Sequence, residues 1–125
     1  MAYKRKLDKD IRCPLEYGID VFGGRWKPRI LCVLSEGELR YSDLRRELVD
    51  ITDTALASAL RELQESDMVV RRQFEEIPPR VEYALTPKGQ STIPLLQAIC
   101  RWSGIFYREV GENAPYKCQR CDFVG

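Results

Sequence analysis

Apolar residues recur every three or four positions in the first half of the chain, which is the spacing of one face of an α-helix. Residues 14–22 fit a short helix that Gly23 and Gly24 would close. Residues 26–34 fit a second helix, with Pro28 tolerated because it falls in the first turn. The apolar pattern of this second helix predicts that it lies in the core.

A turn separates the next two predicted helices. Ser42 is a candidate N-cap for a helix that directs Leu44 inward. The chain then turns at residues 49–51, and Thr52 is a candidate N-cap for a helix that extends to residue 66. A short helix, a brief turn and a second capped helix predict a helix-turn-helix.

The helix at 52–66 separates into two faces. Leu56, Leu60 and Leu63 are spaced i, i+4, i+7 and lie on one side. Short hydroxyls, an alanine and an arginine lie opposite, which allows close approach to base edges and a bidentate contact to guanine. A solvated helix face is the alternative, and the adjoining helix-turn-helix and strand patterns favour DNA reading. The candidate DNA-binding residues of the two helices are Ser42, Thr52, Thr54, Ala57, Ser58 and Arg61.

Two runs of strand-forming residues follow, at 68–74 and 80–85. A short connection that contains Pro78 and Pro79 separates them, so the runs predict a β-hairpin. A hairpin directly after a helix-turn-helix is the wing of a winged-helix domain. The prolines would limit the conformations of its tip, so that less entropy is lost when it binds.

Three arginines on this hairpin are candidate phosphate contacts, namely Arg71, Arg72 and Arg80. The alternative is cross-strand ion pairing with Glu75, Glu76 and Glu82. We expect some of each, with Arg80 the arginine that faces DNA.

Residues from Thr86 to about Asn113 fit one long helix, bent or widened near Pro94. Its apolar residues cover more than one stripe, which is broader than a single winged-helix core can bury. The surplus predicts packing against the same helix of a second copy. The candidate dimer-interface residues are Leu95, Ile99, Trp102, Ile105 and Phe106.

Together these elements predict a mainly α protein with a small β-hairpin (α+β), a winged helix-turn-helix domain with a long C-terminal dimerisation helix. The 125 residues suffice for one domain but not for two. Within it we expect a basic tail at 1–12, the dimerisation helix at 86–113 and a cysteine-bearing tail at 114–125.

The composition mainly excludes certain classes of catalytic site, metal site and membrane protein. The chain contains no histidine, which removes Ser-His-Asp and Cys-His catalysis and every metal site that needs histidine. It also lacks a glycine-rich phosphate loop, so the sequence argues against an enzyme. No apolar run approaches the ~18 residues of a membrane helix, and no secretory signal is present. We therefore expect a cytoplasmic protein with no membrane partner.

The net charge of +1 is unevenly distributed. Residues 1–29 carry eight Lys or Arg and four Asp or Glu, which gives +4 there and −3 over the rest. A basic end favours an anionic partner such as DNA. For residues 1–9 a solvated tail is the alternative.

Five cysteines without an export signal predict reduced thiols rather than a disulfide framework. Cys118 and Cys121 have the CxxC spacing, which supplies one edge of a zinc site or a disulfide. A closed zinc site needs four ligands, so Cys13, Cys100 or the pair of a partner chain would have to complete it. An exposed tail without metal is the alternative. Cys32 and Cys100 lie in apolar helical patterns and are expected to pack in the core.

Four blocks of the sequence, in this order, resemble the HxlR-type transcriptional regulators, relatives of the MarR winged-helix proteins. The blocks are CPLEYGIDVFGGRWKPRIL (13–31), LRYSDLRREL (39–48), LRELQESDMV (60–69) and PPRVEYALTPKG (78–89). The resemblance covers about residues 12–108. It implies a dimeric DNA-binding regulator in which the helix at 52–66 reads the major groove and the hairpin at 69–85 is the wing.

In some members of that family the cysteine that precedes a proline near the N-terminus is a thiol sensor, and Cys13 holds this position. Arg12 beside it would favour the thiolate. We thus expect a non-enzymatic homodimer that binds a palindromic double-stranded operator without a cofactor. Two alternatives remain: a winged helix used as a protein-interaction module, and a redox or metal switch with zinc at the CxxC tail.

Overall fold

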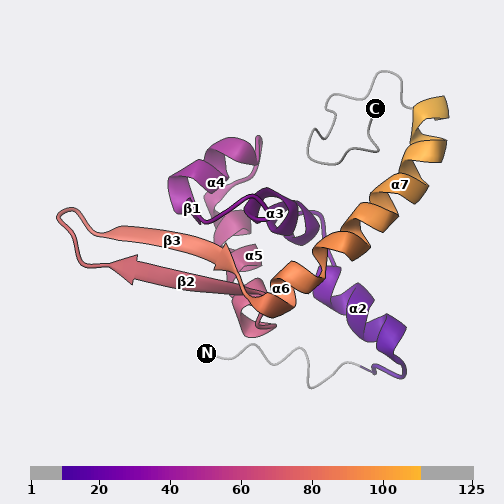
Figure 1. The fold of residues 1–125 in the computed structure, drawn as a ribbon, viewed down its shortest axis with the longest axis horizontal. Coiled ribbons are helices and arrows are strands. Elements are labelled where there is room, and N and C mark those ends of the chain that lie inside the picture. The colour runs from indigo at the N-terminus through magenta and orange to yellow at the C-terminus, as the bar shows by residue number, and fades with distance from the viewer. Residues whose placement is uncertain (1–9, 111–125) are drawn as a thin grey trace.

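The computed structural model describes residues 10–110, with side chains described as far as residue 104. The elements, in chain order, are α2 (Pro14–Phe22), α3 (Lys27–Leu34), β1 (Leu39–Arg40), α4 (Tyr41–Glu47), α5 (Asp53–Glu65), β2 (Val69–Phe74), β3 (Arg80–Leu85), α6 (Pro87–Ser91) and α7 (Ile93–Val110). Figure 1 shows the β2–β3 hairpin projecting from one side of a helical body, with α2 and α7 at the other end. The predicted fold class, mainly α with a small hairpin, is confirmed.

The sheet is antiparallel and three-stranded, in the order β1-β3-β2. The hairpin was predicted correctly, with Val69 opposite Leu85 and Phe74 opposite Arg80. The sequence did not predict β1, because two residues are too short for an alternating pattern. Since β1 pairs Leu39 with Tyr83 and runs directly into α4, the base of the wing is hydrogen-bonded to the start of the helix-turn-helix.

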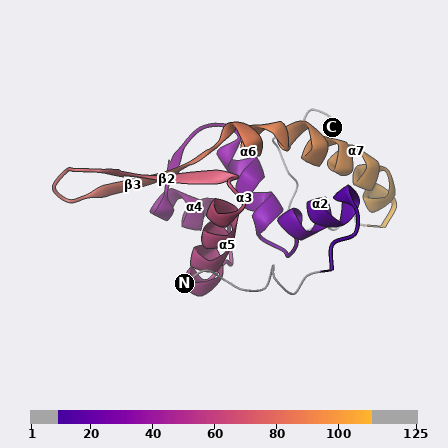
Figure 2. The same ribbon diagram turned by 90° about the horizontal axis from the view of Figure 1, so that it is seen from below.

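The core lies where α3, α4 and α5 converge against the sheet, as both views show (Figures 1 and 2). The predicted core helix α3 contributes Ile30 and Leu31, both with no exposed surface. The leucine face of α5 is equally closed, and each such side chain contributes roughly 1.5–3 kcal/mol by its burial. The largest fully buried side chains are Ile30, Leu31, Leu34, Leu44, Leu56, Leu60, Leu63 and Met68.

The start of α4 differs from the expectation that Ser42 is its N-cap. Arg40 takes the N-cap position, with φ −77° and ψ 160°, and no side chain caps the helix. Pairing of Arg40 with Glu82 in the sheet keeps Arg40 extended, so the helix begins at the very next residue. Ser42 therefore lies inside the first turn of α4, where it is exposed.

The prediction of a single long C-terminal helix was wrong in one respect. The structure has two separate helices, α6 and α7, which meet at Thr92. Thr86 caps α6 as expected, and its Oγ1 accepts a hydrogen bond from the Gly89 amide at 3.0 Å. Pro94 has no N–H to donate back into the preceding turn, which favours a break there. The predicted end of the helix near residue 113 lies outside the described residues.

Gly89 brings α6 against the turn before β2. A Cβ at this position would lie 2.2 Å from the backbone oxygen of Met68, so only glycine permits this approach.

In the described part of the chain, no helix is long and apolar enough to cross a lipid bilayer.

Candidate nucleic-acid interface

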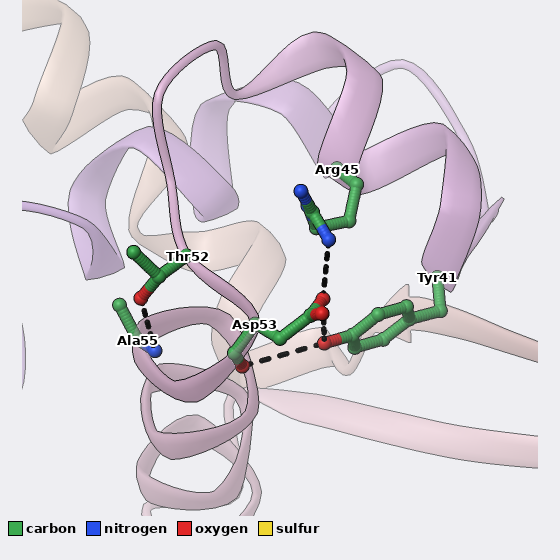
Figure 3. A network of polar contacts seen from close by, with 5 residues as sticks. All are labelled: Tyr41, Arg45, Thr52, Asp53 and Ala55. Carbon is green, nitrogen blue, oxygen red and sulfur yellow. Dashed lines mark hydrogen bonds and ion pairs between the residues drawn. The ribbon is translucent and has the colours of Figure 1, made fainter.

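Helix α5 is fixed at its first turn by contacts within itself and with α4 (Figure 3). Thr52 Oγ1 accepts a hydrogen bond from the Ala55 amide at 3.0 Å, which confirms the predicted N-cap. The Asp53 carboxylate receives the Tyr41 hydroxyl at 3.2 Å and forms an ion pair with Arg45. The contacts of Asp53 join the start of α5 to α4, in addition to the packing of its leucine face.

Tyr41 keeps its proton in this network. Burial raises the pKa of its phenol above the ordinary value, and the negative charge of Asp53 raises it further. The hydroxyl therefore stays a donor to Asp53, which at the N-terminus of α5 also lies at the favourable end of the helix dipole.

The predicted division of α5 into two faces is confirmed. Leu56, Leu60 and Leu63 are at most 1% exposed. On the other side Thr54, Ala57 and Arg61 are exposed and Ser58 is half-buried. The structure thus brings four of the predicted DNA-binding residues onto one accessible face. Thr52 lies at the helix start, where its oxygen is engaged as the cap.

The wing arginines have different environments. Arg71 and Arg72 are exposed on β2. Arg80, by contrast, has only 27% of its side chain exposed, and it forms ion pairs with Glu76 at 2.9 Å and Glu82 at 3.3 Å. Arg80 therefore pairs with Glu76 in the tip loop and with Glu82 on its own strand, not across the hairpin, and these pairs leave it less exposed than Arg71 and Arg72.

Arg80 also stacks on the ring of Phe74, with its guanidinium carbon 4.0 Å from the ring centroid. Phe74 and Arg80 are opposite each other in the last pair of the hairpin. The stack and the two ion pairs hold the base of the tip loop. Ile77, at the tip, is fully exposed.

Helices α2 and α7 lie at the end of the molecule opposite the wing tip (Figures 1 and 2), and both carry exposed apolar side chains. On α2, Leu15 is 71% and Ile19 is 64% exposed. We call the set on the two helices the α2/α7 apolar surface, and it consists of Leu15, Ile19, Leu95, Ile99 and Trp102. Three of the predicted dimer-interface residues belong to it. The side chains of the other two, Ile105 and Phe106, lie outside the described residues.

Comparison with known proteins identifies the family. Residues 21–111 match the family described as HxlR-like helix-turn-helix. The chain belongs to the HxlR-like family. An HTH-type transcriptional regulator of Methanothermobacter thermautotrophicus is 42% identical over 111 residues, covering 86% of this chain and 85% of that one. This HxlR-like protein is accordingly a transcriptional regulator of the helix-turn-helix type.

Two solved structures are similar to this HxlR-like regulator throughout the fold. The redox regulator HypR in its reduced form has a TM-score of 0.73 and 35% identity, covering 81% of this chain and 99% of that one. The reduced transcriptional regulator YodB from B. subtilis has a TM-score of 0.70 and 31% identity, covering 77% and 95%. Both agree with the winged-helix fold class.

The cysteines of this HxlR-like regulator fall into three groups. Cys13 is exposed and is the N-cap residue of α2. Arg12, expected to act on its thiol, instead directs its guanidinium to Asp10 at 2.7 Å. Cys32 and Cys100 are half-buried, and Cys118 and Cys121 lie outside the described residues. Among the side chains that the structure describes, no group of three or more His, Cys, Asp or Glu is placed to hold a metal ion.

A depression that the sequence did not predict lies beside α5. It has a volume of about 560 Å³, and its walls come from α2, the α2–α3 loop, the start of α3 and one flank of α5. We call it the α2–α5 hollow. Because its walls are far apart in the sequence, no local pattern predicts it. The GGRW stretch within the resembling block, residues 23–26, was the one available signal.

Lys27 is one of the residues that line this hollow, and its side chain connects α3 to α5. Although only 6% of the residue is exposed, its charge is paired, since Nζ lies 3.0 Å from Glu62 Oε1 and also donates to the Asp20 carbonyl at 3.4 Å. A buried ammonium without such a partner would cost several kcal/mol. Lys27 therefore links the start of α3 to α5 and to the end of α2.

Proposed function

We propose that this regulator binds double-stranded DNA at a palindromic operator as a homodimer, with α5 in the major groove of each half-site. The observation that carries the proposal is the accessible face of α5. It presents Thr54, Ala57, Ser58 and Arg61 from a helix that is locked by its core face, its cap and its contacts to α4. Short side chains permit close approach to base edges, and an arginine can read guanine.

The α2/α7 apolar surface supports the dimeric part of the proposal. Exposed leucine, isoleucine and tryptophan at one end of a small protein are typical of an interface. Because a twofold axis through this end would leave both α5 helices and both wings outside the contact, the dimer would match a palindrome by symmetry.

Arg61→Ala is expected to weaken operator binding by roughly 1–3 kcal/mol and to relax the base preference at one position of each half-site. Arg72→Ala, on the wing, is expected to weaken the binding to DNA of any sequence by the same factor and to reduce the slope of log K against log salt by about one unit. Binding to an operator library at several salt concentrations measures both effects. Identical sequence profiles for the two variants would contradict the division of roles between α5 and the wing.

The protein-interaction alternative makes a different prediction for the same titration. A protein partner bound by α5 requires no release of counterions from DNA. Strong salt dependence of wild-type binding to duplex DNA therefore argues against that alternative.

We also propose that the Cys13 thiol regulates DNA binding. Cys13 is exposed, and it begins α2, the helix that carries Leu15 and Ile19 of the α2/α7 apolar surface. The half-sites of an operator lie about 34 Å apart, so a small rotation of one subunit against the other would misplace the α5 helices. The name of HypR, a redox regulator, supports the same idea by analogy.

Diamide treatment tests the role of Cys13. We expect wild-type protein to lose operator affinity and Cys13→Ser to keep it. The matched control is Cys118→Ser/Cys121→Ser, which should respond as the wild type does. If Cys13→Ser loses affinity as the wild type does, the thiol that responds is another one, and the role of Cys13 is refuted.

DNA binding by this chain is proposed to need no cofactor, because the side chains of α5 and the wing supply the contacts. A zinc site at Cys118 and Cys121 is the alternative. It requires stoichiometric zinc in the purified protein and loss of operator binding on treatment with a chelator.

A further inference from the structure

The α2–α5 hollow adjoins the face of α5 that is proposed to read DNA. Ala55, Ser58 and Glu62 line the hollow, and they follow the i, i+3, i+7 spacing of one helical stripe. Thr54, Ser58 and Arg61 form the neighbouring stripe toward DNA. Ser58 belongs to both stripes, so the hollow opens at the edge of the base-reading face.

The width of the major groove places a DNA strand near this edge. The groove is about 12 Å wide, and an α-helix with its side chains has a diameter of about 10–12 Å. A helix that fills the groove therefore has a sugar–phosphate strand along each flank. The flank of α5 that carries Ala55 and Glu62 faces the α2–α3 loop.

The α2–α3 loop offers an exposed cation at this place. The guanidinium carbon of Arg25 lies 4.7 Å from the centroid of the Trp26 ring, and that of Arg29 lies 5.1 Å from it. Stacking on an aromatic ring holds a guanidinium in one orientation, so less entropy is lost when its N–H groups bind a phosphate. Among the described residues, no carboxylate pairs with Arg25.

The remaining walls allow a phosphate to come close. Gly23 and Gly24 have no side chains, and a Cβ built on Gly24 would meet no atom within 4 Å. On the opposite wall, Ala55 and Ser58 are small. The Asp20 and Glu62 carboxylates also belong to the lining residues and would repel an anion, and the ammonium of Lys27 neutralises Glu62 at 3.0 Å. Arg25 and Lys27 balance these two carboxylates in formal charge.

We propose that the α2–α3 loop is a phosphate clamp, in which Arg25 holds a phosphodiester of the DNA strand that runs along the α2–α5 hollow. The inference rests on the proposed binding of DNA by α5 and adds a contact on the flank that α4 does not cover. The clamp recognises the backbone and not the bases, so it fixes the register of α5 without adding sequence preference.

The test compares Arg25→Ala with Arg101→Ala in the full-length protein. Arg101 is an exposed arginine on α7, so its loss removes the same charge at a distance from α5. Affinity for an operator duplex and for a scrambled duplex is measured by fluorescence anisotropy at several salt concentrations. Thermal unfolding of each variant provides the check that the fold is intact.

We expect Arg25→Ala to bind both duplexes roughly 5- to 10-fold more weakly and to reduce the salt slope by about one unit. Arg101→Ala should change the affinity less than about twofold and leave the slope unchanged. If the two variants behave alike while Arg61→Ala loses operator preference, the clamp is refuted and the role of α5 stands. If Arg61→Ala also leaves the preference intact, the proposed function itself is refuted.

Discussion

Gly89→Ala is expected to destabilise the protein by at least about 3 kcal/mol, a large share of the ~5–15 kcal/mol that keeps a typical domain folded. The added Cβ would lie 2.2 Å from the backbone oxygen of Met68 and 3.2 Å from the Leu85 side chain. Since a backbone atom cannot move aside as a flexible side chain can, α6 would have to separate from the turn before β2. Chemical denaturation and thermal unfolding followed by circular dichroism measure the loss.

Helix propensity alone would make a Gly→Ala substitution stabilising, so the expected loss of stability at Gly89 has the opposite sign. Gly18→Ala is the matched control. Gly18 lies within α2, and a Cβ there would meet no atom within 4 Å. Alanine at this site should leave the stability unchanged or increase it by about 0.5–1 kcal/mol. Equal midpoints for Gly89→Ala and wild type would show that the approach of α6 to Met68 is not a tight one.

Ile99→Glu is expected to give a monomer and to weaken binding to a palindromic operator by more than about 100-fold. Ile99 is 48% exposed, one helical turn from Leu95 on α7, so a carboxylate there would be buried in the proposed dimer without a partner. A monomer also loses the gain from holding two half-sites at once, which amounts to about 10²–10⁴ in affinity. Sedimentation and operator titration measure the two effects.

Gln90→Glu is the control for the added charge. Gln90 is exposed on α6 and is not part of the α2/α7 apolar surface. This variant should remain dimeric and bind the operator about as tightly as the wild type. An Ile99→Glu protein that is monomeric and yet binds the palindrome with wild-type affinity would contradict the dimer proposal.

Features that depend on short-range chemistry could be predicted from the sequence. The cap at Thr52 and the three leucines of α5 follow from residues a few positions apart, and both are found in the structure. The β2–β3 hairpin is equally local. These features suffice for a winged-helix assignment and for the accessible face of α5.

Features that depend on distant neighbours could not be predicted in this way. The N-cap of α4 moved to Arg40 because β1 pairs with β3, which lies some forty residues further along the chain. Arg80 is a different case, because its partners Phe74, Glu76 and Glu82 lie within six residues of it, and the sequence left both pairing and DNA contact open. The α2–α5 hollow exists only once residues 19–27 and 55–62 have come together.

The two tryptophans of the chain occupy separate surfaces, and this gives the protein two built-in optical probes. Trp26 lies in the wall of the α2–α5 hollow under the Arg25 guanidinium, whereas Trp102 is 66% exposed on α7. Indole emission responds to nearby charge and to water. The fluorescence emission of Trp26 therefore reports on what occupies the flank of α5. The emission of Trp102 reports on what covers the α2/α7 apolar surface. In a Trp102→Phe protein, the emission spectrum follows events at α5 without any attached dye.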